Sequence, residues 1–198
     1  MTSMIYIKEL ESPKINKKEI MRYASVKGNI PEIDTLIDSC VDECERLLLY
    51  KVCYGFYPVQ ICGDNIDLGF AKVKSHSLGL CLNGCSKIIL LCATVGIGID
   101  RLIGKYSIIS PSRAVIMQAI GSERVESLCD CFVATLAEEL CESLCPRFSP
   151  GYGDLPLDLQ EDIFKALSPF SKIGVSLGKD MFMTPSKSVT AIIGIKDN

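Results

Sequence analysis

The feature that most constrains the fold is a long helical pattern in the second half of the chain. From about Pro111 to Cys145, apolar residues recur at the three- and four-residue spacing of a helix. Ser110 or Ser112 is placed to cap its first turn, and Pro146 cannot continue a helix interior. The sequence therefore predicts that one long helix is the backbone of this half.

Short β-type segments predict a sheet for the helices to cover. Residues 33–49 form a strongly amphipathic helical pattern that must pack on something, and a sheet is the expected partner. Residues 51–59 and 66–70 flank the turn Gly63-Asp64-Asn65 and predict adjacent antiparallel strands. Residues 87–94 are a continuous apolar run, typical of a central strand covered on both faces.

The order of these elements predicts an α+β fold, with helices flanking a mainly antiparallel, meandering sheet. We expect residues 1–198 to form one domain, with 1–50 as its N-terminal helical part and 51–198 holding the sheet, the long helix and a ligand loop. The remaining predicted elements are an extended segment at 4–10, a helix from Asn16 as N-cap to near Gly28, a second helix opening at Pro31, a short helix at 75–85, a helix at 157–167, and strands at 173–177 and 188–195.

Composition excludes several classes of protein. Although 48% of residues are hydrophobic, the longest apolar run, 88–93, is too short to cross a bilayer. Glu9, Glu11 and several lysines precede any apolar run, unlike a secretory signal, so we expect a cytoplasmic protein. The net charge of −3, with scattered basic residues, lacks the footprint of nucleic-acid binding.

The eleven cysteines allow two interpretations. Cys40/Cys44, Cys81/Cys85 and Cys141/Cys145 are each four residues apart, the spacing of buried positions on one helix face, so small buried thiols are favoured. A metal or redox role remains the alternative, with Cys81, Cys85 and Cys92 as a loose cluster.

Two further patterns point away from catalysis. His76, the single histidine, lies at a predicted helix start, where a capping or surface role is favoured over general-base chemistry. Residues 93–98 contain two glycines after a predicted strand but lack the third glycine and acidic partner of a dinucleotide site. We interpret them as a strand-to-helix turn.

The loop from Arg147 to Pro156, Arg-Phe-Ser-Pro-Gly-Tyr-Gly-Asp-Leu-Pro, is the most unusual local sequence. Arg147 offers a planar guanidinium for a carboxylate, and Tyr152 offers a ring face or a phenol. Gly151 and Gly153 permit a close approach of the backbone or a positive φ. Such a loop can wrap a small ligand. A solvent-exposed turn with an incidental arginine is an equally open interpretation of the residues alone.

These residues resemble a known family. The loop Arg-x-Ser-Pro-Gly-Tyr is similar to the Arg-Pro-Ala-Pro-Gly-Tyr loop of the activation domain of cobalamin-dependent methionine synthase. Residues 118–128, Gln-Ala-Ile-Gly-Ser-Glu-Arg-Val-Glu-Ser-Leu, resemble the family's Lys-Ala-Leu-Ala-Asp-Arg-Leu-Ala-Glu-Ala-Phe helix. Residues 181–189, Met-Phe-Met-Thr-Pro-Ser-Lys-Ser-Val, resemble its Phe-Ala-Met-Trp-Pro-Gly-Ala-Ser-Val strand entry.

The resemblance implies an S-adenosylmethionine (AdoMet) site made of Glu126, Arg147, Ser149, Gly151 and Tyr152, with Ser149 acting through its backbone. Arg147 suits the ligand's carboxylate, and Glu126 its ammonium and sulfonium groups. The family's N-terminal aspartate has no counterpart before residue 50, and its tyrosine pair falls beyond residue 198, so the resemblance implies a reduced set of contacts.

The resemblance also implies a function. The chain is expected to be a stand-alone reactivation component that presents the methyl donor for reductive methylation of cob(II)alamin, with little activity alone. Its partners would be the cobalamin-carrying methionine synthase subunit or another corrinoid protein, and a reductant such as flavodoxin or ferredoxin. The alternative is a non-catalytic AdoMet sensor, or a docking module for another corrinoid protein.

Overall fold

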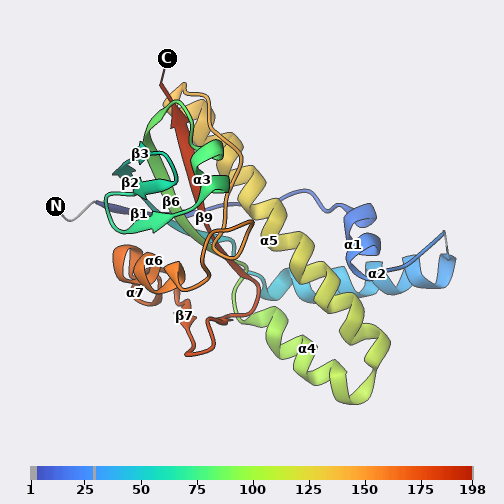
Figure 1. The fold of residues 1–198 in the computed structure, drawn as a ribbon. Helices are drawn as coiled ribbons and strands as arrows, with labels where there is room; N and C mark the ends of the chain where they lie inside the picture. Colours follow the sequence, from blue (N-terminus) through green and yellow to red (C-terminus); the bar gives the residue numbers. More distant parts are fainter. Residues whose placement is uncertain (1–3, 29, 198) are drawn as a thin grey trace.

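The computed structural model describes residues 4–28 and 30–197, in which helices flank an antiparallel sheet (Figure 1). The predicted α+β class is confirmed. The helices are α1 (Lys17–Tyr23), α2 (Pro31–Cys44), the 3-10 turn η1 (Glu45–Leu47), α3 (His76–Cys81), α4 (Gly98–Ile109), α5 (Pro111–Leu140), α6 (Leu159–Leu167) and α7 (Pro169–Ile173). The strands are β1 (Ile5–Glu9), β2 (Lys51–Pro58), β3 (Gln60–Cys62), β4 (Asn65–Asp67), β5 (Lys72–Lys74), β6 (Cys85–Thr94), β7 (Ser176–Leu177), β8 (Met183–Thr184) and β9 (Ser188–Lys196).

The main sheet has the strand order β1-β2-β6-β9, and every neighbouring pair is antiparallel. As predicted, β6 is an interior strand with both faces covered: Ile89 and Leu91 join the apolar cluster beneath α5, while Ile88 and Leu90 join the cluster beneath α6. All four side chains are fully buried. This continuous burial explains why the strand lacks a polar alternation.

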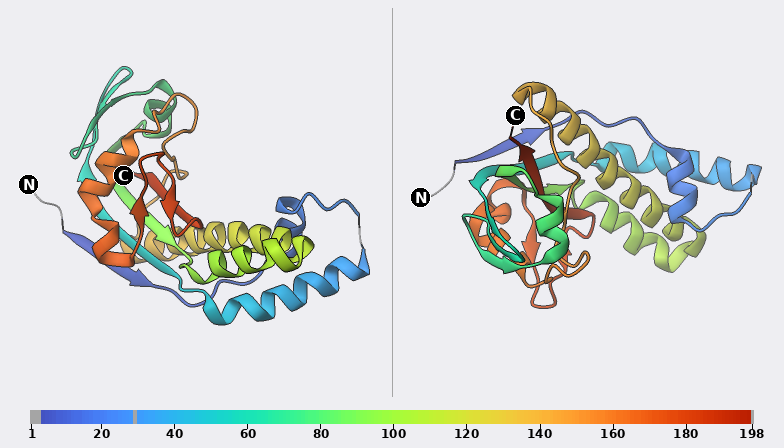
Figure 2. Two further views of the ribbon diagram at one scale, coloured as in Figure 1. Left: turned by 90° about the horizontal axis from the view of Figure 1, so that it is seen from below. Right: turned by 45° about the horizontal axis from the view of Figure 1, so that its top comes forward.

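Helix α5 runs from the main sheet out beyond one end of it, where α2 and α4 lie alongside it and α1 packs on it (Figure 2). The predicted opening of α2 at Pro31 is confirmed, and so is the predicted N-cap of α1, since Asn16 Oδ1 accepts a hydrogen bond from the Glu19 backbone at 3.4 Å. Helix α1 ends at Tyr23, earlier than predicted, and α2 gives way at Cys44 to η1.

Helix α5 begins where predicted but ends at Leu140, not at Cys145. Cys141 adopts a left-handed conformation, φ 54°, which terminates the helix. The following residues pair with the free edge of β9: the Cys145 NH donates to Gly194 O at 2.8 Å, and Phe148 and Ile192 exchange two bonds at 2.9 and 2.8 Å. Residues 143–148 thereby form an extended segment beside the sheet.

Two strand predictions need correction. Residues 51–58 form β2, but β4 does not pair with it; β4 lies in a separate sheet of order β3-β4-β5. Ile173 is the end of α7, so the predicted strand at 173–177 shrinks to the two residues of β7. The short helix after Ser75 and the final strand β9 are confirmed.

The cysteine prediction holds for one helical pair. Cys40 and Cys44 are both buried on α2. The other two pairs do not share a helix, because Cys85 begins β6 and Cys145 follows the end of α5. The loose cluster is also divided: Cys85 Sγ lies 3.5 Å from Cys145 Sγ, whereas Cys92 is the cross-strand partner of Cys53. Within the described residues, no three His, Cys, Asp or Glu side chains are grouped to hold a metal ion.

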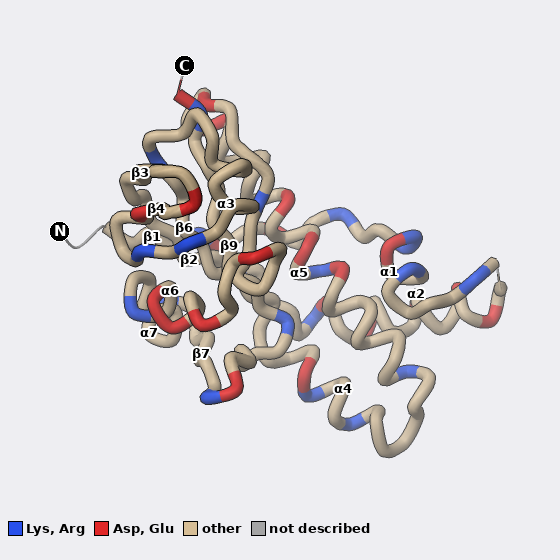
Figure 3. The backbone as a smooth tube through the Cα atoms, viewed as in Figure 1, with Lys and Arg blue, Asp and Glu red and all other residues tan. Residues whose placement is uncertain are grey.

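Basic and acidic residues are scattered over the chain, whereas the charged residues of α2 are all acidic (Figure 3). Across residues 4–28 and 30–197, no helix is both long and apolar enough to cross a membrane.

Candidate functional site

The candidate site is built where the loop after α5 folds back onto that helix. Arg147 Nη2 donates hydrogen bonds to Glu126 Oε2 at 2.9 Å and to Asp130 Oδ1 at 2.8 Å. Glu126 and Asp130 are four residues apart, so they occupy one stripe of α5. Arg147 is fixed between Cys145 and Phe148, both of which hydrogen-bond to β9. The sheet thus presents Arg147 to two carboxylates of the helix.

One donor of Arg147 has no acceptor. Its Nη1 atom is buried and, among the residues that the structure describes, makes no hydrogen bond. A buried donor without a partner costs about 1–3 kcal/mol, more when it is charged. Because protein atoms enclose this nitrogen, a ligand can reach Arg147 only through the 20% of its side chain that is exposed to solvent.

The acidic side of the site is partly open to solvent. The side chains of Glu126 and Asp130 are 39% and 72% exposed, against 20% for Arg147. Partial desolvation of its carboxyl group, and then the negative charge of Glu126, raise the pKa of Asp130. Two carboxylates around one guanidinium leave a net negative charge, which suits a cationic group of a ligand.

The loop itself is a pair of tight turns. The Tyr152 NH donates to Ser149 O at 3.1 Å, and the Gly151 NH donates to Leu155 O at 2.9 Å. Gly151 has φ 88° and Gly153 has φ 54°, so the predicted positive φ at both glycines is confirmed. The Tyr152 ring packs edge-on against Phe148 at 6.3 Å and is 58% exposed. Ser149, Gly151 and Tyr152 therefore share one turn next to Arg147.

Asp154 attaches this loop to α3. Its carboxylate accepts hydrogen bonds from Ser75 Oγ at 2.6 Å, the His76 NH at 2.7 Å and the Ser77 NH at 3.1 Å. The bond from Ser75, followed by that from the His76 backbone, holds the pKa of the Asp154 carboxyl far below its usual range. Asp154 was not predicted from the sequence, although a short helix at 75–85 was.

His76 lies at the first turn of α3, where its Nδ1 is 3.0 Å from Asp64 Oδ1. Its side chain is 68% exposed. This agrees with the predicted capping or surface position. Residues 93–98 likewise form the predicted turn between β6 and α4.

Lys187 is a second residue that sequence analysis missed. Its Nζ donates to Ser122 Oγ at 3.0 Å, one turn before Glu126 on the same stripe of α5. Burial lowers the pKa of its ammonium group, opposed in part by the charge of Asp100. A row of polar groups therefore follows α5 from Ser122 through Glu126 to Asp130, with Lys187 at one end and Arg147 at the other.

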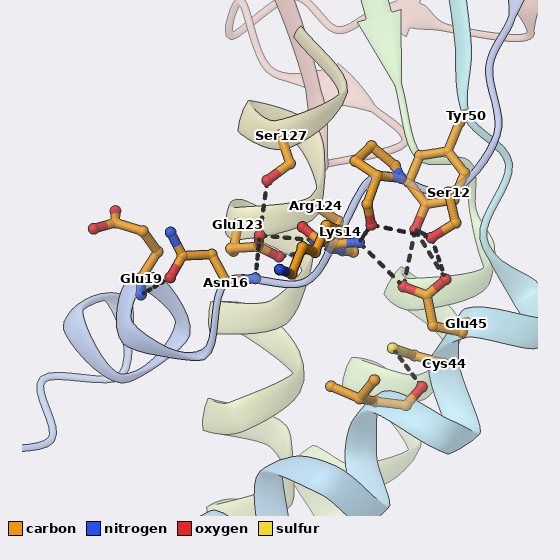
Figure 4. Close-up of polar contacts among 12 residues, drawn as sticks. Ser12, Lys14, Asn16, Glu19, Cys44, Glu45, Tyr50, Glu123, Arg124 and Ser127 are labelled. Carbon is orange, nitrogen blue, oxygen red and sulfur yellow. Dashed lines mark hydrogen bonds and ion pairs between the residues drawn. The ribbon is translucent and has the colours of Figure 1, made fainter. Parts of the chain in front are cut away.

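A buried ion pair occupies a neighbouring stripe of α5 (Figure 4). Arg124 donates to Glu123 at 2.6 and 2.7 Å, and the two residues are 0% and 2% exposed. Arg124 also donates to Pro13 O at 2.6 Å and Lys14 O at 3.0 Å. Glu123 accepts from the Asn16 NH at 3.1 Å. This pair binds residues 13–16 to the helix that carries the candidate site.

The sequence matches no protein-family model and no curated protein at a significant level. Among solved structures, it is similar to the MetH reactivation domain bound to AdoHcy, with a TM-score of 0.70 over 97% of this chain and 78% of that chain, at 15% sequence identity. The two chains share a fold. The reactivation-domain fold thus agrees with the architecture expected from the loop and helix motifs, while the individual site residues remain predictions.

Proposed function

We propose that this chain binds AdoMet at the Arg147 site and serves as a reactivation component for a cobalamin-carrying partner. The observation that carries the proposal is the meeting of Arg147 with Glu126 and Asp130, inside a fold shared with a reactivation domain bound to AdoHcy. AdoMet and AdoHcy differ by the methyl group on sulfur, so a site for one offers contacts to the other.

The residues fit the chemistry of this ligand. The paired carboxylates of Glu126 and Asp130 suit the sulfonium and ammonium groups, and the partly exposed Arg147 side chain suits a ligand oxygen. Tyr152 offers an exposed aromatic ring, and Ser149 and Gly151 belong to the same turn, in which the Ser149 carbonyl and the Gly151 NH bond within the loop. Glu126, Arg147, Ser149, Gly151 and Tyr152 are therefore our proposed AdoMet-binding residues.

The chain's contribution to the reaction is positional. It would hold AdoMet so that the methyl group faces the partner, and exclude competing orientations through the rigid loop fixed by β9 and α3. The partner's cobalamin, with an external electron donor such as flavodoxin or ferredoxin, supplies the reductive chemistry of methyl transfer. We therefore expect little turnover by the chain alone.

Calorimetric titration with AdoMet and AdoHcy tests the binding site. Arg147→Met should weaken AdoMet binding about tenfold or more, the value of a lost charge-assisted hydrogen-bond set. Arg22→Met is the matched control, because Arg22 also pairs with a glutamate on its neighbouring turn, at 2.6 Å, but on α1. Absence of AdoMet binding by the wild type, or equal affinities for the Arg147 and Arg22 variants, would refute the site.

Methylation of cob(II)alamin on a corrinoid protein, with a low-potential reductant, tests the role. Transfer of the AdoMet methyl group that depends on this chain and on Arg147 supports reactivation. Tight AdoMet binding without any transfer to the corrinoid partner would instead favour a non-catalytic sensor or docking module.

A further inference from the structure

Lys187 places a positive charge beside the proposed AdoMet site. Its half-buried side chain reaches Ser122 Oγ at 3.0 Å, and Ser122 lies one helical turn from Glu126. Four residues of helix span about 6 Å, so the ammonium of Lys187 and the carboxylate of Glu126 face the same short stretch of α5.

The position of Lys187 is built into the fold. A Cβ on Gly121 would lie 2.8 Å from the Lys187 Cγ and 3.0 Å from its Cε, so the glycine makes room for the lysine stem. The backbone on either side is also held: the Ser186 NH donates to Asp100 at 2.8 Å, and Lys187 O accepts from the Val95 NH at 3.1 Å. The ammonium is therefore presented by a fixed backbone.

The two cations of the site differ in their pairing. Arg147 already contacts two carboxylates, so a further carboxylate at its side would be repelled by Glu126 and Asp130. Across the described part of the chain, no carboxylate lies within ion-pair distance of the Lys187 ammonium: Asp100 raises its pKa from farther away, and its hydrogen-bond acceptor is the neutral hydroxyl of Ser122. Negative charge from a ligand is thus better accommodated at Lys187 than at Arg147.

We infer that Lys187 is a ligand-binding residue that holds the carboxylate of the amino-acid moiety, while Glu126 and Asp130 receive its positive groups. The inference rests on the proposed function and revises the orientation expected from the sequence, in which Arg147 took the carboxylate. Arg147 then keeps its two ion pairs with Glu126 and Asp130. The short carbon chain between sulfonium and carboxylate matches one turn of α5.

A thermodynamic cycle that combines one substitution in the protein with one change in the ligand tests this orientation. The wild type and Lys187→Met are titrated with AdoMet and with decarboxylated AdoMet, which lacks only the carboxylate. The wild type should bind decarboxylated AdoMet about tenfold or more weakly, as expected for a lost charge-assisted contact, whereas Lys187→Met should bind both ligands with similar affinity. Lys187→Arg should retain the discrimination.

Matched variants separate the possible outcomes. Lys179→Met, an exposed lysine between β7 and β8, should behave like the wild type. Arg147→Met should weaken the binding of both ligands by a similar factor. If Lys187→Met does not fold, as judged by its thermal transition, Lys187→Gln replaces it in the cycle.

If Lys187→Met or Lys187→Gln still binds AdoMet more tightly than decarboxylated AdoMet by the wild-type factor, or if Arg147→Met loses this difference instead, the inference is overturned while AdoMet binding stands. A wild type that binds neither ligand would refute the proposed function itself. The two failures are therefore distinguished by the wild-type titration alone.

Discussion

Replacing Arg124 by methionine removes the positive half of a fully buried ion pair. Glu123, at 2% exposure, would lose the two hydrogen bonds at 2.6 and 2.7 Å and keep those from Ser127 and Asn16. The carbonyls of Pro13 and Lys14 would lose their donor as well. Breaking a buried pair by removing one partner costs about 3–5 kcal/mol, which is the expected loss in the free energy of unfolding.

Urea denaturation and thermal melting measure this loss. For a chain of 198 residues, each kcal/mol shifts the Tm by about 2–4 °C, so Arg124→Met should lower the Tm by about 6–20 °C. The surface variant Arg22→Met removes an exposed pair with Glu19 of similar length, 2.6 Å, and should lower the Tm far less than Arg124→Met does.

The double variant Glu123→Gln/Arg124→Met identifies the cause. Because it removes the uncompensated buried charge, it should be more stable than Arg124→Met by about 1–3 kcal/mol. A double variant that is less stable than the single one, or a single variant within about 1 kcal/mol of the wild type, would refute the account of Glu123 as a charge that depends on Arg124.

Two further predictions concern the loop. Asp154→Asn should lower the Tm at neutral pH. Because folding depresses the pKa of Asp154, the Tm difference between variant and wild type should be full above the ordinary aspartate pKa of about 3.9 and should shrink at lower pH. A Tm difference that stays constant down to about pH 3 would contradict this. Gly153 has φ 54°, and a Cβ there would lie 2.7 Å from Ser77 Oγ, so Gly153→Ala should lower the free energy of unfolding by about 1–2 kcal/mol in urea denaturation. Gly104 on α4 has open space around it, so Gly104→Ala should stabilise the protein slightly. Equal effects of the two substitutions would contradict the role of positive φ.

Local pattern predicted the beginnings of elements better than their ends. Asn16, Pro31 and Ser75 act through bonds or φ restrictions within their own turn, so their positions as helix starts could be recognised from sequence. The end of α5 could not be recognised in the same way: Pro146 indicated a later end, but residues 143–148 leave the helix and hydrogen-bond to β9. That competition involves a strand some fifty residues away, beyond the reach of local periodicity.

The same distinction applies to the cysteines. Cys40 and Cys44 share the periodic face of a real helix, so their burial followed from spacing. Cys81 and Cys85 have the same spacing, but α3 ends at Cys81 and β6 begins at Cys85. Four-residue spacing indicates a shared face only where the helix continues through both positions.

At the candidate site, sequence reasoning identified the residues carried by two motifs and missed those brought in from elsewhere. Asp130 could have been predicted, since it follows Glu126 by four residues on a helix that the sequence pattern already indicated. Asp154 lay in the recognised loop, but its role requires α3 to be beside that loop. Lys187 becomes part of the site only because the segment before β9 returns to α5.

Helix α5 explains why these distant segments meet. Its buried pair binds residues 13–16, its polar row meets Arg147 and Lys187, and its apolar positions rest on the main sheet. Each contact uses a different stripe or turn of the same rigid element, so the separation of the charges is set by helical geometry and not by the flexibility of the loops. Such a fixed row recognises a ligand with charges of both signs best, because the charged side chains lose their conformational freedom when the protein folds and not when the ligand binds.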